Sequence, residues 1–218
     1  MLSIIKSIAL QGLQGYLVST EIDISAGIPN FEIVGLPDVS VKESKYRIKT
    51  AIKNSGLDFL SRKIIVNLAP ANIRKEGSMF DLPIAIGILI ANENIINPQL
   101  ENYLKDTAII GELSLNGNIE KINGILPICI EAKRLGIKRI ILPQQNALEA
   151  SIVKGIDILP ANNLIEIVDF FNGNSIIEKQ KNTNYFNQSG AFYEFDFSEV
   201  KGQENVKRAL EIAAAGRT

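Results

Sequence analysis

The stretch Lys75-Glu-Gly-Ser-Met-Phe-Asp-Leu-Pro-Ile-Ala-Ile-Gly-Ile-Leu-Ile-Ala91 decides the fold of this chain. From Leu82 to Ala91 it is apolar on nearly every side, which predicts a helix buried on most of its faces. Pro83 fits the first turn of that helix, where a backbone N–H would have no partner in any case. Asp81 or Ser78 is expected to cap it. The fold is therefore expected to form around this helix.

Strands and helices alternate on both sides of the buried helix. Period-two alternation and short apolar runs predict strands over residues 2–10, 16–25, 31–34, 63–68, 108–115, 118–122, 139–143 and 156–159. Further helices are predicted up to about Asn54 and over about 127–135, 147–153 and 164–171. Asn116-Gly117 between alternating runs is the strongest short hairpin signal. A strand-rich start and a β-α-β-α tail predict an α+β fold, a mixed sheet packed with helices.

The helix that ends near Asn54 has clear boundary signals and a clear buried face. Asp38 or Ser40 is expected to cap its start, and Gly56 lies just beyond its end as a left-handed stop. Its predicted inner face consists of Val41, Ser44, Ile48, Ala51 and Ile52.

The segment between Ser40 and Glu76 carries nine basic residues against three acidic ones, in a chain whose net charge is −1. Four of the nine share one helix face at spacings of three and four. Clustered cations bind phosphates by displacing counterions and need no sequence code, so DNA contact is one interpretation. A solvated helix face opposite an apolar one is the other. The candidates for DNA contact are Lys42, Lys45, Arg47, Lys49, Lys53, Arg62, Lys63, Arg74 and Lys75.

The absence of histidine excludes Ser-His-Asp and Cys-His catalysis. With Cys129 as the single cysteine, neither an internal disulfide nor a metal site is expected, and Cys129 itself is expected in the core. Glu112 and Glu120 flank the predicted hairpin and are interpreted as exposed turn charges. The first ten residues lack a secretory signal, and no apolar run approaches the roughly 18 residues that span a bilayer. A soluble, cytoplasmic protein without a membrane partner is expected.

Six stretches in the first 90 residues identify a family. They closely resemble the N-terminal domain of the magnesium-chelatase-like ComM (YifB) family, and the resemblance covers most of residues 1–171. It implies a domain similar to the proteolytic domain of Lon, on a ribosomal protein S5 domain 2-like fold. It also implies that the full-length protein is a hexameric AAA+ motor for branch migration of DNA during natural transformation. The stretches are Ala26–Asp38, Val41–Ser44, Ala51–Gly56, Val66–Ala71, Lys75–Ser78 and Phe80–Gly87.

The resemblance divides the chain into three parts. Residues 1–171 are expected to form the Lon-like domain, and the polar, turn-rich residues 172–196 a linker. Residues 197–218 are expected to be the truncated start of the ATPase module, where Gly202 and Gln203 border the nucleotide site. No G-x-x-x-x-G-K-[ST] phosphate loop occurs in the chain, so that nucleotide site is incomplete. No cofactor is expected in this chain, whereas ATP and magnesium are expected for the full-length protein.

The Lon-type serine motif resembles Glu76-Gly-Ser-Met-Phe-Asp-Leu-Pro83. Laid over it, the position of the nucleophile falls on Met79, and Ser78 lies one residue early. One residue rotates a side chain by about 100° at a helix start. A helix cap explains Ser78 better than catalysis does.

The Lon-type lysine segment resembles residues 111–127, where the position of the base falls on Leu126. The nearest lysine, Lys121, lies five residues away. Both catalytic positions are thus apolar, and the domain is interpreted as a pseudo-peptidase. A shifted Ser78–Lys121 or Ser78–Lys75 dyad is the remaining catalytic alternative.

The sequence as a whole predicts a non-catalytic accessory domain that supports ring assembly and guides DNA. The chain alone is expected neither to hydrolyse ATP nor to unwind DNA. A pure protein-interaction or assembly module and a residual Ser–Lys peptidase are the alternative functions.

Overall fold

The computed structural model of the chain describes residues 2–12, 14–181 and 199–215. These belong to two compact units, Met1–Thr183 and Asn184–Thr218, and each unit is described by itself. Among the described residues, the second unit contributes one helix, α7 (Glu204–Ala215), and every other element belongs to the first.

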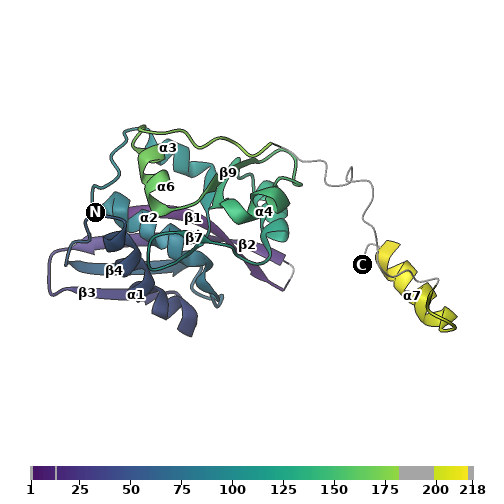
Figure 1. The fold of residues 1–218 in the computed structure, drawn as a ribbon. Helices are drawn as coiled ribbons and strands as arrows, with labels where there is room; N and C mark the ends of the chain where they lie inside the picture. The colour runs from purple at the N-terminus through teal and green to yellow at the C-terminus, as the bar shows by residue number, and fades with distance from the viewer. Residues whose placement is uncertain (1, 13, 182–198, 216–218) are drawn as a thin grey trace. The chain divides into compact units, whose positions relative to one another are not determined.

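A mixed seven-stranded sheet with the order β3-β4-β2-β1-β5-β8-β9 forms the centre of the first unit (Figure 1). The β1–β2 and β2–β4 pairs are antiparallel, and the remaining pairs are parallel. A mixed sheet packed with helices confirms the predicted α+β class. The strands are β1 (Leu2–Gln11), β2 (Gln14–Ser25), β3 (Asn30–Val34), β4 (Lys63–Ala69), β5 (Thr107–Ile109), β8 (Arg139–Pro143) and β9 (Asp157–Ala161).

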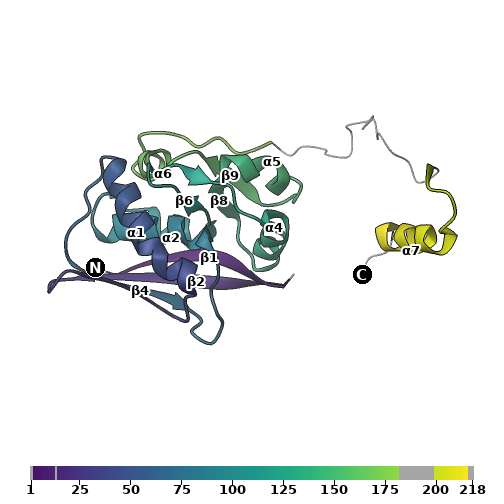
Figure 2. The ribbon, with the colours of Figure 1, turned by 60° about the horizontal axis from the view of Figure 1, so that its bottom comes forward.

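The helices of the first unit pack on this sheet. Helices α1 and α2 lie on the same side of β1, β2 and β4 (Figure 2). The α-helices are α1 (Val39–Asn54), α2 (Asp81–Ala91), α3 (Leu100–Lys105), α4 (Ile125–Arg134), α5 (Ala147–Ala150) and α6 (Leu164–Phe171). Two short 3₁₀ turns are η1 (Ser78–Phe80) and η2 (Gln144–Asn146).

Helix α2 confirms the predicted buried helix, because all of its residues are buried. Gly87 allows it to lie directly on the sheet, since a Cβ there would come 2.1 Å from Ile22 Cδ1. The predicted cap was wrong. Ser78 begins η1, and Asp81 turns inward, so that no side chain caps the start of α2.

Helix α1 matches its predicted limits closely. The Asp38 carboxylate accepts a hydrogen bond of 2.7 Å from Val41 N and is therefore the cap. All five residues of the predicted inner face are buried. Gly56 follows the helix with φ +74, as the predicted left-handed stop.

The predicted strand over 108–115 is split in two. Its first part, β5, belongs to the central sheet, and its second part, β6 (Glu112–Leu113), pairs with β7 (Ile119–Glu120) in a small hairpin. The chain bends at Gly111, whose N–H donates to Met79 O and whose carbonyl accepts from Leu82 N, both at 3.0 Å. These bonds draw the chain away from the sheet toward α2. The Asn-Gly turn is confirmed, with Gly117 N donating to Ser114 O.

Apolar residues pack on both faces of the central sheet. One cluster joins Ile5 and Ala9 of β1 to α1, α2 and α6, and the other joins Ile8 to α4 and α5. Cys129 lies in the second cluster, fully buried, and burial raises the pKa of its thiol to about 12. The predicted core position of Cys129 is therefore confirmed.

The beginning of the predicted linker packs on the first unit. Ile177 lies against the first apolar cluster, and Gln180 N donates to Ile158 O of β9 at 2.9 Å. Lys179 Nζ lies 2.6 Å from Asp157 Oδ2. Residues 182–198 lie outside the described residues, and the predicted boundaries at 171, 172–196 and 197 stay predictions. None of the helices in the described ranges has the length and apolar character needed to cross a bilayer.

Candidate functional site

A pocket of about 290 Å³ opens where η1 meets the β6–β7 hairpin. It brings together the residues on which the peptidase interpretation depends, Ser78, Met79 and Lys121, with Glu112 and Tyr16 beside them. We call it the Ser78 pocket. Its lining consists of Ala9, Leu10, Tyr16, Glu76, Gly77, Ser78, Met79, Glu112, Lys121, Ile122 and Asn123.

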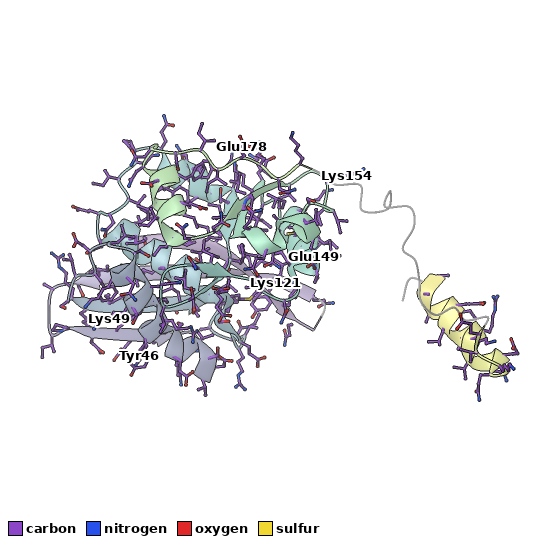
Figure 3. All side chains as sticks on the ribbon, in the orientation of Figure 1. Tyr46, Lys49, Lys121, Glu149, Lys154 and Glu178 are labelled. Carbon is purple, nitrogen blue, oxygen red and sulfur yellow. The ribbon has the colours of Figure 1, made fainter. Side chains whose placement is uncertain are left out.

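The Ser78 hydroxyl donates its hydrogen bond to the Glu112 carboxylate, not to a lysine. Glu112 is half-buried and pairs in register with Glu120 across the hairpin, so it is not the exposed turn charge that the sequence predicted. Lys121 is exposed at the rim of the same pocket (Figure 3). A serine held by a carboxylate is not activated by a lysine base, which Ser–Lys catalysis needs.

The two positions that correspond to the Lon nucleophile and base carry core side chains. Met79 is partly buried against both apolar clusters, and Leu126 against the second. Neither side chain can supply a nucleophile or a proton acceptor. The polar groups of the pocket are instead the Ser78 hydroxyl, bonded to Glu112, and Lys121 at the rim.

Lys75 lies in the interior, although the sequence placed it among the DNA-contact candidates. Its side chain is fully buried, and its ammonium donates to the carbonyl oxygens of Pro70 and Ile73, the latter at 2.8 Å. Burial lowers the pKa of Lys75. Because this ammonium is used to hold the loop after β4, Lys75 leaves the set of phosphate-contact candidates, and it is not a base for Ser78.

Arg47 also leaves the set of phosphate-contact candidates, because its guanidinium is engaged inside the domain. Its guanidinium forms a bidentate ion pair with the fully buried Asp81, at 2.7 Å from Nε to Oδ2 and 3.0 Å from Nη2 to Oδ1. Nη2 also donates to Ser40 O at 3.3 Å. Burial raises the pKa of Asp81 to about 6 despite the opposing effect of Arg47, and the hydrogen bond to Asp81 raises the pKa of Arg47. This pair joins α1 to α2.

Six of the remaining basic side chains form what we call the basic band. Four lie along the solvent face of α1, and two lie where the chain enters β4. Lys49 Nζ is 5.9 Å from the Phe59 ring centroid, which places the segment between α1 and β4 against the band. Arg74 lies after β4 and pairs with Glu76 at 3.4 Å, so it is not included. The basic band consists of Lys42, Lys45, Lys49, Lys53, Arg62 and Lys63.

Relatives of this chain fall into two groups. A family model for subunit ChlI of Mg-chelatase matches residues 20–146. The competence protein ComM of Haemophilus influenzae is 38% identical over 223 residues, which cover 99% of this chain and 42% of that protein. The uncharacterized protein YifB of Escherichia coli is 37% identical over 215 residues, which cover 99% of this chain and 41% of that protein. The chain belongs to the magnesium-chelatase-like ComM (YifB) family. It spans about two fifths of the length of these relatives.

The second group supports the Lon-like domain. The archaeal Lon protease of Methanocaldococcus jannaschii is 29% identical over 120 residues, which cover 55% of this chain and 18% of that protein. Together with the mixed sheet, this match gives the first unit a Lon-like fold. Ser78 and Met79, in the stretch that resembles the Lon-type serine motif, both line the Ser78 pocket.

The nucleotide-site candidates of the ComM family module lie just before α7. Gly202 and Gln203 both have positive φ, +73 and +59, and lead directly into the helix. No residue of α7 is buried within its unit. Since the sequence contains no phosphate loop, these residues do not fit a complete ATP site, and no nucleotide chemistry is assigned to them.

Two functional candidates were missed by the sequence reasoning. Glu112 is the partner of Ser78, but a contact across 34 residues leaves no local signal. Tyr46 does have a signal, because it follows Lys42 by four residues and precedes Lys49 by three, the spacings of one helix face. Its side chain lies on α1 beside Lys49 (Figure 3) and is 67% exposed.

The geometry of the Ser78 pocket leads to a prediction about peptide hydrolysis. The purified chain should not cleave a fluorogenic peptide or casein above the background rate, because the nucleophile and base positions are apolar. Ser78→Ala should leave that background unchanged, as should Ser175→Ala, a control at an exposed position outside the pocket. Cleavage that Ser78→Ala abolishes and Ser175→Ala preserves would restore the residual-peptidase alternative.

Proposed function

We propose that the first unit is a non-catalytic accessory domain of a ComM-type AAA+ ATPase, and that it guides DNA through the basic band. The observation that carries this proposal is the set of six cations on α1 and at the start of β4, all of which except the half-buried Lys45 are exposed. Without Lys75, Arg47 and Arg74, the nine candidates are reduced to six that lie on the outer side of α1 and where the chain enters β4.

The family context supports a role for the band in the full-length protein. We propose that the complete protein is a hexameric motor in the cytoplasm that uses ATP and magnesium for branch migration, and that one relative's name, competence protein, reflects uptake of DNA. A ring repeats each weak site around one axis, and linked weak sites gain affinity without new contacts. The domain then helps to assemble the ring and to hold DNA near it.

Fluorescence anisotropy with labelled single-stranded and forked DNA over a salt titration tests this proposal. Binding should weaken steeply with salt, with a slope of about −4 in log K against log salt if all six cations meet phosphates of a single strand. Lys45→Glu with Lys49→Glu should weaken binding at least about 10-fold. The salt dependence should become shallower, with a slope of about −3 in place of −4.

A charge control and a clear negative outcome complete the test. Lys154→Glu with Lys179→Glu changes the net charge by the same amount outside the band, and should have a much smaller effect. Equal losses from the two double variants would show that only net charge matters. Absence of binding at low salt would overturn the DNA role.

A protein-interaction module is the second candidate, and a groove of about 830 Å³ favours it. Leu2 and Ile4 of β1 and Ile96 line this groove and are more than half exposed. β1 is paired with β5 at one residue pair, Lys6 with Ala108, so the beginning of β1 has an open edge there. If the chain does not bind DNA at low salt, this groove becomes the better-supported functional surface.

A further inference from the structure

Tyr46 occupies the middle of the basic band rather than its border. On a helical wheel it lies within about 60° of Lys42, Lys49 and Lys53. Its side chain is 67% exposed, which is high for a tyrosine on a helix whose opposite face is buried. The aromatic ring is therefore presented to solvent among four lysines of one helix.

The ring has no evident role in folding. The other aromatic rings near the band, Phe31 and Phe59, pack partly buried against the main apolar cluster, whereas Tyr46 is not part of that packing. The contact of its ring is with a cation, Lys45 Nζ, at 4.9 Å from the centroid. Such a pair at an exposed site contributes little to stability. A structural role in α1 thus does not account for the residue.

Aromatic side chains extend along the band beyond Tyr46. Lys49 Nζ lies over the Phe59 ring at 5.9 Å, and Phe59 in turn lies 6.3 Å from Phe31, centroid to centroid. Phe31 belongs to β3, which pairs with β4 from Lys63 onward, and Arg62 directly precedes β4. The band is therefore a row of cations with one exposed ring and a half-buried pair of rings along it.

Cations and exposed rings together recognise a particular form of nucleic acid. A duplex offers phosphates but keeps the faces of its bases stacked inside. A single strand offers phosphates and bases whose faces can stack on a tyrosine, with little dependence on base identity. A band made of lysines alone would bind both forms through charge. The exposed ring adds an interaction that only unpaired bases can make.

We propose that Tyr46 stacks on an unpaired base and makes the basic band selective for single-stranded DNA over duplex. This inference rests on the proposed DNA-guiding function of the band. Lys42, Lys45, Lys49 and Lys53 hold the phosphates on either side of the stacked nucleotide. The domain then favours the unpaired strand at a junction where a duplex is being opened.

The test compares two ligands and three proteins. Anisotropy of the 218-residue chain is measured at low salt with a labelled oligothymidine and with a labelled duplex of equal length. Tyr46→Ala should weaken binding of the oligothymidine by about 5- to 150-fold, the range for loss of one stacked base. It should change duplex binding less than about 2-fold, because the cations remain. Tyr46→Phe keeps the ring and should bind both ligands like the wild type.

Each outcome has a distinct meaning. Because Tyr46 is exposed, thermal unfolding of Tyr46→Ala should match that of the wild type, and this measurement separates a binding effect from a folding effect. Equal losses on the two ligands, or no loss on either, would overturn the stacking role and leave the band a charge-only site. If the wild-type chain binds neither ligand at low salt, the DNA-guiding function itself fails.

Discussion

Gly35→Ala is expected to lower the free energy of unfolding by about 4 kcal/mol, the upper end of single-residue effects. Gly35 follows β3 with φ +95, a conformation that alanine adopts only with strain. A Cβ at this position would lie 2.2 Å from the carbonyl oxygen of Leu68 and 2.9 Å from its backbone carbon and nitrogen. Because these atoms belong to β4, the clash cannot be relieved by a side-chain rotation. The strand pair at the edge of the sheet has to separate.

Gly56→Ala is the matched control for this prediction. Gly56 also has positive φ, +74, but nothing lies within 4 Å of a Cβ built on it. Gly56→Ala should therefore lower the free energy of unfolding only by the strain of the left-handed backbone, about 1–2 kcal/mol. Urea unfolding followed by circular dichroism gives both values. If the two variants lose the same stability, the close approach of Leu68 carries no cost, and the packing described for this turn is wrong.

Much of the fold could be predicted because the relevant signals are local. The inner face of α1 follows from helical spacing alone, and the buried helix α2 follows from the apolar run between Leu82 and Ala91. The Asn116-Gly117 turn follows from the backbone conformations that these two residues tolerate. The split of the strand over 108–115 was not predictable in the same way. It depends on Gly111 bonding to Met79 and Leu82, which are about 30 residues earlier in the chain.

The candidate site was harder to predict than the fold, because a charged residue in a sequence does not reveal its partner. In the sequence, Lys75 and Arg47 look like any other surface cation. In the structure, Lys75 holds a loop and Arg47 neutralises a buried carboxylate. Asp81 was expected to cap α2 because the sequence does not reveal its distant partner. Only the tertiary structure shows that Arg47 and Asp81 meet across 34 residues. The lysines of α1 lie on its outer side, as expected, because their spacing places them opposite the apolar face of the helix.

Arg47→Met is the second variant for which a large effect is expected, a loss of about 3–5 kcal/mol at neutral pH. Methionine keeps most of the side-chain volume but leaves Asp81 buried without its cation. Asp81 then retains one hydrogen bond in the structure, from Leu113 N at 3.4 Å. Arg74→Met is the control, because the Arg74 and Glu76 side chains are 67% and 69% exposed in their pair. An exposed pair of this kind contributes at most about 1 kcal/mol.

The pH dependence of these variants identifies the cause. Burial raises the pKa of Asp81 in the folded protein to about 6, above its ordinary 3.8, so the folded state binds this proton more tightly than the unfolded state. The stability gained from that proton is complete below about pH 4 and is lost as the pH rises through about 6, by up to about 3 kcal/mol. Removal of Arg47 raises the pKa of Asp81 further, because the guanidinium is the group that favours the carboxylate.

The destabilisation caused by Arg47→Met should therefore grow with pH. Near pH 4.5 Asp81 is largely protonated in both folded proteins, and the difference should fall to about 1 kcal/mol, the contribution of lost packing and hydrogen bonds. Near pH 7.5 the wild type carries the ion pair, whereas the variant must either bury a lone carboxylate or keep it protonated. Arg47→Met in an Asp81→Asn background should show no such growth, since asparagine does not titrate. Urea unfolding of the four proteins at the two pH values measures this difference. A penalty that is the same at both pH values would mean that Arg47 stabilises the contact between α1 and α2 by packing rather than by charge.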